Sequence, residues 1–84
     1  MIITWDERKR QSNLLKHGLD FADLDEEFFL DASVIDAKER RFMAIGKLHG
    51  ELIIAVVFAP LGAEALSIIS MRKAAKKERS MTNG

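Results

Sequence analysis

One apolar run constrains the fold of this chain more than any other feature of its sequence. Residues 52–58, LIIAVVF, are rich in β-branched side chains and include no polar residue. Such a run is typical of a central strand that is covered on both faces. Pro60, Leu61 and Gly62 follow it, and we expect them to end the strand. The sequence therefore predicts a sheet with neighbouring strands on both sides of this run.

The segments around the run alternate in polarity with the period of two that strands have. We expect three of them to be strands: residues 33–35, 41–47 and 65–71. Residues 36–39 form a polar turn between the first two, and His49-Gly50 is expected to form the hairpin turn before the apolar run. Ile2 and Ile3 suit a short first strand.

A basic helix is predicted after the first strand. Thr4 and Glu7 stand in the T-x-x-E relation of a capping box, which would begin the helix. Gly18 stands where a left-handed residue ends a helix, so the helix is expected to run to about His17. Its basic side chains, which suit a solvated face or a surface that meets phosphates, are Arg8, Lys9, Arg10 and Lys16.

A second helix is expected to begin at Asp20, its N-cap candidate, and to end near Phe29. Phe21, Leu24 and Phe28 fall on one face of such a helix, because they are three and four residues apart. We expect these three side chains to lie in the core.

A closing helix, capped by Ser70 and running through Arg79, completes the expected order of elements, and residues 82–84 are expected to be frayed. This order predicts an α+β fold: a small antiparallel β-sheet with two N-terminal helices and a C-terminal helix. We expect residues 1–84 to form this single domain. The helices would cover one face of the sheet, which leaves the second face to the terminal helix or to a partner chain.

Charge is strongly segregated along the chain, although the formal net charge is zero. Residues 20–39 carry eight acidic side chains and one lysine, whereas residues 1–19 and 40–84 are both net basic. Two basic segments around an acidic one suggest separate surfaces. One would face an anion, and the other would avoid that anion or meet a basic partner. The acidic segment could equally neutralise its neighbours within the fold.

Several absences narrow the class of protein. The chain has no cysteine, which excludes disulfides and thiolate metal sites and suits the cytoplasm. Its first residues lack the basic-then-apolar order of a signal peptide, and its longest apolar run is far shorter than the ~20 residues that a membrane helix needs. His17 and His49 lack metal-ligand spacing. We expect a cytoplasmic protein without membrane association, bound metal or cofactor.

Three motifs in order resemble a known family over nearly the whole chain. Residues 5–21 fit W-D-x-x-K-x-x-x-N-x-x-K-H-G-x-x-F, residues 41–46 fit R-[FY]-x-x-I-G, and residues 68–79 fit I-I-S-A-R-x-A-x-x-x-E-R at all but one position. These are motifs of the BrnT toxins, which the chain resembles. The resemblance implies a RelE-like ribonuclease fold and a toxin role in a bacterial type II toxin–antitoxin system. It also implies a cognate antitoxin with a ribbon-helix-helix DNA-binding domain, so that DNA is met only through the antitoxin.

The chain departs from the family pattern at three positions. Ser67 stands where the family usually has an arginine, Met81 where it has a closing tyrosine, and Met71 where it has an alanine. Ser67 removes a permanent cation that could hold a phosphate with two hydrogen bonds. An alternative function therefore stays open. The chain could be a catalytically weakened or inactive toxin scaffold that binds an antitoxin and regulates transcription.

RNA can be cut without metal when its 2′-hydroxyl attacks the adjacent phosphate. The protein then supplies a base, an acid for the leaving oxygen, and cations for the charge that develops. Arginine suits the last task because its planar fork donates two parallel hydrogen bonds. Histidine suits the first two because its pKa lies near neutrality.

The candidate catalytic residues are His17, Arg41 and Arg72, and the candidate RNA-binding residues are Lys9, Lys16, Lys73 and Lys76. His17 has a second possible role as a cation at the C-terminal end of its helix. We expect the cations to converge on one concave patch that grips a phosphodiester. A third hypothesis is a plain RNA-binding module, whose binding would weaken steeply with salt.

Overall fold

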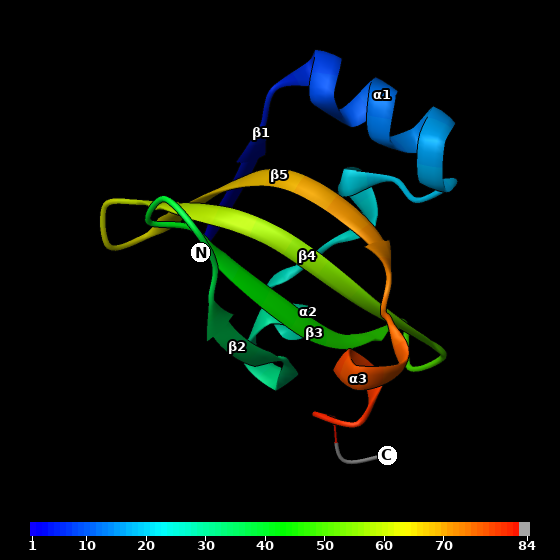
Figure 1. Ribbon diagram of the computed structural model, residues 1–84. Helices are drawn as coiled ribbons and strands as arrows, with labels where there is room; N and C mark the ends of the chain where they lie inside the picture. Colours follow the sequence, from blue (N-terminus) through cyan, green and yellow to red (C-terminus); the bar gives the residue numbers. More distant parts are fainter. Residues whose placement is uncertain (83–84) are drawn as a thin grey trace.

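The structure is a computed structural model that describes residues 1–82, and it has an α+β fold (Figure 1). Its elements in chain order are β1 (Ile2–Trp5), α1 (Glu7–His17), the 3₁₀ turn η1 (Phe21–Asp23), α2 (Glu26–Asp31), β2 (Ser33–Asp36), β3 (Phe42–Leu48), β4 (Leu52–Leu61), β5 (Ala65–Lys73) and α3 (Lys76–Arg79). The α+β class and the strands that the alternating segments predict are therefore confirmed.

The five strands form one sheet in the order β1-β5-β4-β3-β2. All neighbours are antiparallel except β1 and β5, which run parallel. The apolar run forms the central strand, as predicted, and β4 ends at Leu61, within the predicted stretch of residues 60–62. Pro60 pairs with Leu66 of β5. The β3 ladder ends at Phe58, so the residues of β4 beyond it have no neighbour on that side and tolerate a proline.

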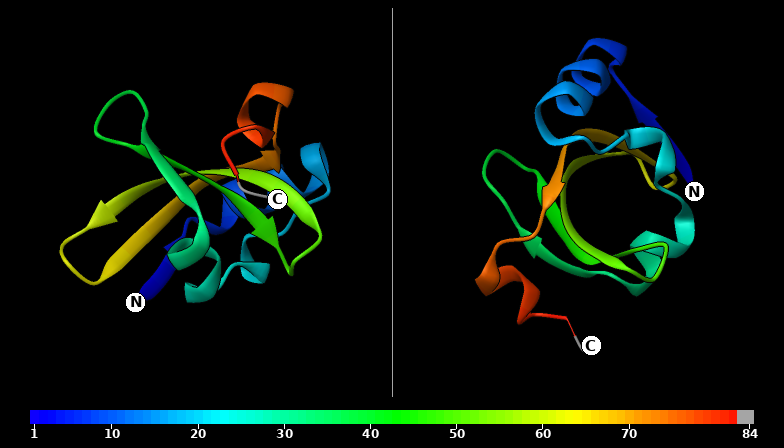
Figure 2. Two further views of the ribbon diagram at one scale, coloured as in Figure 1. Left: turned by 90° about the horizontal axis from the view of Figure 1, so that it is seen from below. Right: turned by 90° about the vertical axis from the view of Figure 1, so that its right-hand side faces the viewer.

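The inner face of the sheet, which we define as the face covered by η1 and α2, holds the main core. Figure 2 shows the strands curving around these two elements. Phe21, Leu24 and Phe28 are buried there, as predicted, together with Phe29. The rings of Phe29 and Phe58 meet edge to face with centroids 5.4 Å apart. This core fixes η1 and α2 against β3, β4 and β5.

The predicted second helix is divided into two. Asp20 caps only the 3₁₀ turn, where it accepts the Ala22 N–H, and Asp25 begins α2 by accepting the Phe28 N–H at 2.9 Å. Two aspartates five residues apart each offer a helix start, and Leu24 between them has extended backbone angles. The expected continuous helix from Asp20 is therefore wrong.

α1 has the predicted end and a different beginning. Gly18 is left-handed, with φ 71°, and its N–H donates to the carbonyl of Leu14. The predicted capping box is wrong, because Thr4 belongs to β1 and donates its hydroxyl proton to the Leu66 carbonyl instead. Asp6 is the N-cap, and its carboxylate accepts the Arg8 N–H at 2.8 Å.

The end of the chain also differs from its prediction. Ser70 is a strand residue opposite Val57 and caps no helix, because β5 continues to Lys73. The helix that follows is a single turn. Residues 74–82 then cross the second face of the sheet, where Ala74 is buried and Ser33 donates a hydrogen bond to the Met81 carbonyl. The expectation for residues 83 and 84 lies outside the described residues.

Candidate functional site

The second face of the sheet carries the candidate site, and we call it the outer face. The register places Met43, Val57 and Ser70 in one row across it, and Ile45, Ala55 and Arg72 in the next row. Ser67 lies opposite Ala59 on the same face. The C-terminal segment covers the row that ends in Arg72, since Ala74 packs with Ile45 and Ala55. The row of Ser70 is left partly exposed.

Arg72 is held by a carboxylate of the segment that follows it. Its Nη1 and Nη2 donate to the two carboxylate oxygens of Glu78 at 2.7 and 2.8 Å, and Glu78 also accepts the Ala75 N–H at 2.7 Å. These contacts hold the pKa of Glu78 at about 2, mainly through the hydrogen bonds from Arg72. The same pairing raises the pKa of Arg72. The pair fastens α3 to the end of β5.

Arg41 is half-buried at the start of β3 and has no ion pair or side-chain hydrogen bond within residues 1–82. Side chains alternate along a strand, so Arg41 shares the outer face with Met43. The β3–β4 ladder ends at the next residue, where Phe42 pairs with Phe58, and Ala59 after Phe58 pairs with Ser67. Strand spacings place the Cα atoms of Arg41 and Arg72 roughly 15–20 Å apart.

α1 is fixed to the sheet by Asn13, the buried polar residue of the helix. The ladder between β1 and β5 ends at Ile68, which leaves the rest of this edge of β5 without a strand. The side-chain amide of Asn13 donates to the Met71 carbonyl at 2.8 Å, and its oxygen accepts the Met71 N–H at 3.0 Å. One side chain thus pairs with the strand edge as a neighbouring strand would.

The two flanks of α1 face different sides of the sheet. Glu7 and Arg10 lie on the inner side, where Glu7 accepts the Trp5 indole N–H at 3.1 Å and Arg10 binds Asp20 at 2.8 Å. The hydrogen bonds from Arg10 lower the pKa of Asp20. At 100° per residue, Lys9 and Lys16 fall on the opposite side of Asn13, toward the outer face. The basic flank of α1 therefore borders the outer face.

The structure does not gather all seven predicted site residues. Lys9, Lys16, Arg41 and Arg72 lie on the outer side of the molecule, and Lys76 is exposed on α3 beside the Arg72–Glu78 pair. His17 lies on the flank of α1 that carries Arg10. Lys73 follows Arg72 directly on β5, so its side chain turns to the inner side.

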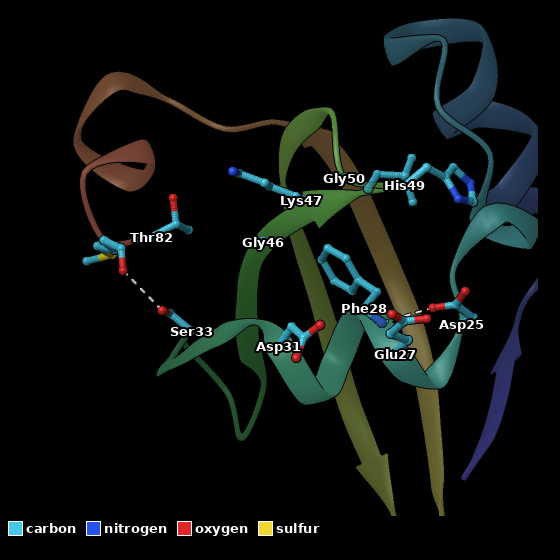
Figure 3. Close-up of a pocket in the computed structure, with 12 residues that line it drawn as sticks. Asp25, Glu27, Phe28, Asp31, Ser33, Gly46, Lys47, His49, Gly50 and Thr82 are labelled. Carbon is cyan, nitrogen blue, oxygen red and sulfur yellow. Dashed lines mark hydrogen bonds between the residues drawn. The ribbon is translucent and has the colours of Figure 1, made fainter. Parts of the chain in front are cut away.

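A hollow of about 470 Å³ lies elsewhere in the described part of the chain (Figure 3). Its lining includes Asp25, Glu27, Phe28, Asp31, Ser33, Lys47 and His49, and none of the seven predicted residues. The outer face lies on the convex side of the curved sheet in Figure 2. The expectation of one concave cationic patch is therefore not met.

A salt bridge is an expected role for Glu78 in a basic segment, but sequence reasoning did not identify Arg72 as its partner. Glu78 follows Arg72 by six residues, a spacing that brings no side chains together within one helix, and a short turn between strand and helix makes the contact. Within residues 1–82, no three histidine, aspartate or glutamate side chains are grouped to hold a metal ion. None of the helices described there has the length and hydrophobicity of a bilayer-spanning segment.

Comparison of the chain with solved structures identifies the class of protein to which it belongs. The crystal structure of the Brucella abortus ribonuclease toxin BrnT has 62% sequence identity to this chain and a TM-score of 0.85. The match covers 90% of this chain and 99% of that one. The class is therefore that of the small ribonuclease toxins.

The family follows from a second comparison. The model of the family described as "Ribonuclease toxin, BrnT, of type II toxin-antitoxin system" matches residues 5–78. The chain belongs to the BrnT family, which confirms the resemblance in the sequence motifs. A toxin of a type II system implies an RNA substrate and an antitoxin partner. A search of curated proteins gave no match.

Proposed function

We propose that this chain is a metal-independent endoribonuclease that inhibits translation until a cognate antitoxin covers it. The observation that carries the proposal is the presence of Arg41, Arg72 and the basic flank of α1 on one side of a BrnT fold. Phosphates attract such a side because lysine and arginine neutralise their charge. The comparisons give no support to the alternative of an inactive scaffold.

The proposed reaction transfers the phosphate within the RNA strand. The 2′-oxygen attacks the adjacent phosphorus and loses its proton to a base, while the bond from phosphorus to the 5′-oxygen breaks and that oxygen gains a proton. The products are a 2′,3′-cyclic phosphate and a 5′-hydroxyl. Arg41 is the proposed cation for the charge on phosphorus, because its guanidinium donors have no partner within residues 1–82.

His17 is the proposed proton acceptor. It lies one helical turn beyond Asn13, whose side chain binds Met71, the residue before Arg72. The Asn13–Met71 contact therefore keeps the C-terminal end of α1 near Arg72, although His17 is on the other flank of the helix. RNA that meets both residues must pass over this end of α1.

Arg72 is proposed to act while Glu78 still holds it. Glu78 takes one hydrogen bond from Nη1 and one from Nη2, so the Nε–H remains for a phosphate oxygen. Lys9, Lys16, Lys73 and Lys76 are proposed to bind the RNA backbone outside the reacting phosphate. Such contacts position the strand and make its affinity depend on salt.

Four further expectations belong to this proposal. The fold is RelE-like, and residues 1–84 form one toxin domain. The antitoxin carries a ribbon-helix-helix domain and makes the contacts to DNA. The protein acts in the cytoplasm, where its RNA substrate is. These expectations come from the resemblance of the sequence motifs to the BrnT toxins, and the family match over residues 5–78 supports that resemblance.

The test is cleavage of purified RNA by the purified chain, with EDTA and with added Mg²⁺. Cleavage in EDTA, with products that end in a cyclic phosphate, is the expected result. Expression of the chain without its antitoxin should also stop growth. Cleavage that requires Mg²⁺ contradicts metal independence alone, whereas intact RNA under both conditions and normal growth contradict the enzymatic function.

A further inference from the structure

The outer edge of β2 is free, and its backbone geometry suits an added strand. β2 is the last strand of the sheet, and Figure 1 shows no further strand beside it among residues 1–82. Ala37 donates its N–H to the Arg41 carbonyl at 2.9 Å, which fixes the hydrogen-bonding phase of this antiparallel pair. The N–H and C=O groups of Val34 and Asp36 then point away from β3. They leave two donors and two acceptors for another chain.

The side chains around this edge are apolar and exposed. Val34 and Ile35 on β2 are 49% and 38% exposed. Leu30, near the end of α2, is 72% exposed, and Met81, whose carbonyl is bound by Ser33, is 46% exposed. Edge strands of soluble proteins are usually protected by charge, by proline or by a covering element. Within residues 1–82, Asp36 is the charged side chain of this strand and the Met81 contact reaches only its Ser33 end, so Val34 and Ile35 between them stay exposed.

The hollow of Figure 3 begins at the Ser33 end of the same strand. Asp31 and Ser33 line it, and two more acids of the α2 region, Asp25 and Glu27, continue it. Lys47 is the one lysine of its lining. Asp36 adds a carboxylate at the other end of β2. A chain that runs along β2 and into the hollow therefore meets Asp36 and the apolar side chains of the strand first, and then the carboxylates of the hollow.

We propose that the free edge of β2 and the adjoining hollow bind an extended, basic and apolar segment of the antitoxin, which pairs with β2 as a sixth strand. The proposal rests on the proposed function, since it requires an antitoxin. Backbone hydrogen bonds supply affinity in strand addition, and alternate side chains supply specificity. The segment places apolar side chains beside Val34 and Ile35, and lysine or arginine side chains beside the carboxylates of the hollow.

Charge excludes the other occupants. A second copy of the chain, paired through β2 about a two-fold axis, would bring the acids of both copies near one another, with Lys47 as the lysine of each hollow. RNA is repelled by the same carboxylates. A stable interface buries about 800 Å² on each partner, more than a four-residue strand provides. The hollow and the exposed Leu30 supply the remaining area.

The edge of β2 and the hollow would hold the antitoxin without covering the proposed RNA site. Among the cations of the proposed RNA site, Arg41 and Arg72 lie on the outer face, and Lys9 and Lys16 lie on α1. The acids of the hollow lie on or beside α2. An antitoxin held at β2 is free to reach the cations with other residues. The segregation of charge along the sequence thus corresponds to two binding surfaces, one for RNA and one for a basic partner.

The experiment uses the antitoxin that copurifies with the tagged chain, identified by mass spectrometry and then produced separately. Its Kd is measured for the chain itself, for Val34→Pro and for the double variant Asp31→Lys/Asp36→Lys. Proline removes an outward N–H and leaves the β2–β3 hydrogen bonds intact, and neither aspartate has an ion pair within residues 1–82. Glu51→Lys/Glu64→Lys is the control, because it changes the net charge equally in two hairpin turns.

We expect Val34→Pro and the aspartate pair each to raise the Kd about tenfold or more, and the control pair to raise it less than about threefold. In the complex, hydrogen exchange of the Val34 and Asp36 amides should slow about tenfold or more. Far-UV circular dichroism checks that every variant is folded. Unchanged Kd values together with unprotected amides overturn this proposal and leave the proposed function intact.

Two other outcomes also decide the matter. If no antitoxin copurifies with the unaltered chain, the result contradicts both the antitoxin partner of the proposed function and the binding of an antitoxin segment at β2. Sedimentation of the chain alone tests the second-copy occupant. A dimer that Val34→Pro dissociates would show that β2 pairs with itself, which contradicts the antitoxin segment.

Discussion

Asn13 and Met71 are joined by two hydrogen bonds between a side-chain amide and a strand backbone, at 2.8 and 3.0 Å, although 58 residues separate them. The same amide also donates to the Leu19 carbonyl at 3.2 Å. One buried side chain thus ties together α1, the segment after it and the edge of β5. It also holds the basic flank of α1 beside the outer face.

Replacement of this amide should loosen the whole arrangement. Asn13→Ala leaves the N–H and C=O of Met71 buried without partners, so we expect a loss of about 2–3 kcal/mol in the free energy of unfolding. Ser12→Ala, at an exposed neighbouring position, should change it by less than about 0.5 kcal/mol. Urea unfolding followed by circular dichroism measures both. Equal values for the two variants contradict the role given to Asn13.

The pair of Arg72 and Glu78 predicts a pH dependence of stability. The pKa of Glu78 is about 2 in the folded chain, below its ordinary value of 4.5. A lowered folded-state pKa stabilises the fold above the unfolded-state pKa, and this contribution is lost as the pH falls toward the folded value. Glu78→Gln should therefore be less stable than the unaltered chain by about 1–2 kcal/mol at pH 7.

The difference between these two proteins should shrink as the pH falls below about 4.5 and vanish near pH 2. Thermal unfolding at several pH values between 2 and 7 measures it. Glu64→Gln, in the turn between β4 and β5, is the matched control and should show no such trend. A difference that stays constant over this range would show that Glu78 acts through packing alone.

Local patterns predicted most of the strands, because the polarity of the side chains along a strand alternates every two residues and does not depend on which strand lies beside it. The central strand was predictable from its unbroken apolar run, and the turn at His49-Gly50 and the left-handed Gly18 were predictable because glycine favours such backbone angles. Ser70 shows the limit of this approach. A serine suits a helix cap, but here Ser70 pairs with Val57 in the sheet. That pairing depends on residues that are distant in the sequence, and it overrides the local preference for a cap.

The candidate site was predictable in its residue types and only partly in its geometry. Motifs named the cations, but the side of α1 on which each lies depends on Asn13 meeting β5, a contact between distant parts of the chain. The parallel pairing of β1 with β5 is equally distant in sequence. Periodicity carries no information on such pairings, so it could not show which flank of α1, that of Lys16 or that of His17, borders the outer face.

Ser67→Arg tests the departure from the family motif. Ser67 is half-buried on the outer face, and its neighbour across the ladder, Ala59, is small enough to leave room for a longer side chain. A guanidinium there would lie on the same face of the sheet as Arg41, so we expect RNA cleavage to rise about tenfold. Ala63→Arg adds the same charge in the turn between β4 and β5 and should leave the rate unchanged. Equal rates for the three proteins would show that catalysis never depended on position 67.

Arg41 gives the sharpest test of the proposed chemistry, because its guanidinium has no partner within residues 1–82 and its loss should disturb the fold little. Arg41→Ala should lower the rate of RNA cleavage about a hundredfold, the usual cost of one donor that stabilises developing charge. Arg41→Lys keeps the charge but loses the planar fork, so its cleavage rate should lie between those of the unaltered chain and Arg41→Ala. Lys38→Ala, in the same turn, removes an equal charge and serves as control.

Single-turnover cleavage with saturating protein separates this role from simple attraction of RNA. If Arg41 acts on the reacting phosphate, the rate at saturation falls while the dissociation constant of the RNA changes less than about threefold. If it only attracts the strand, the dissociation constant rises and the rate at saturation is kept. The second result would move Arg41 from the catalytic residues to the RNA-binding ones, beside Lys9 and Lys16.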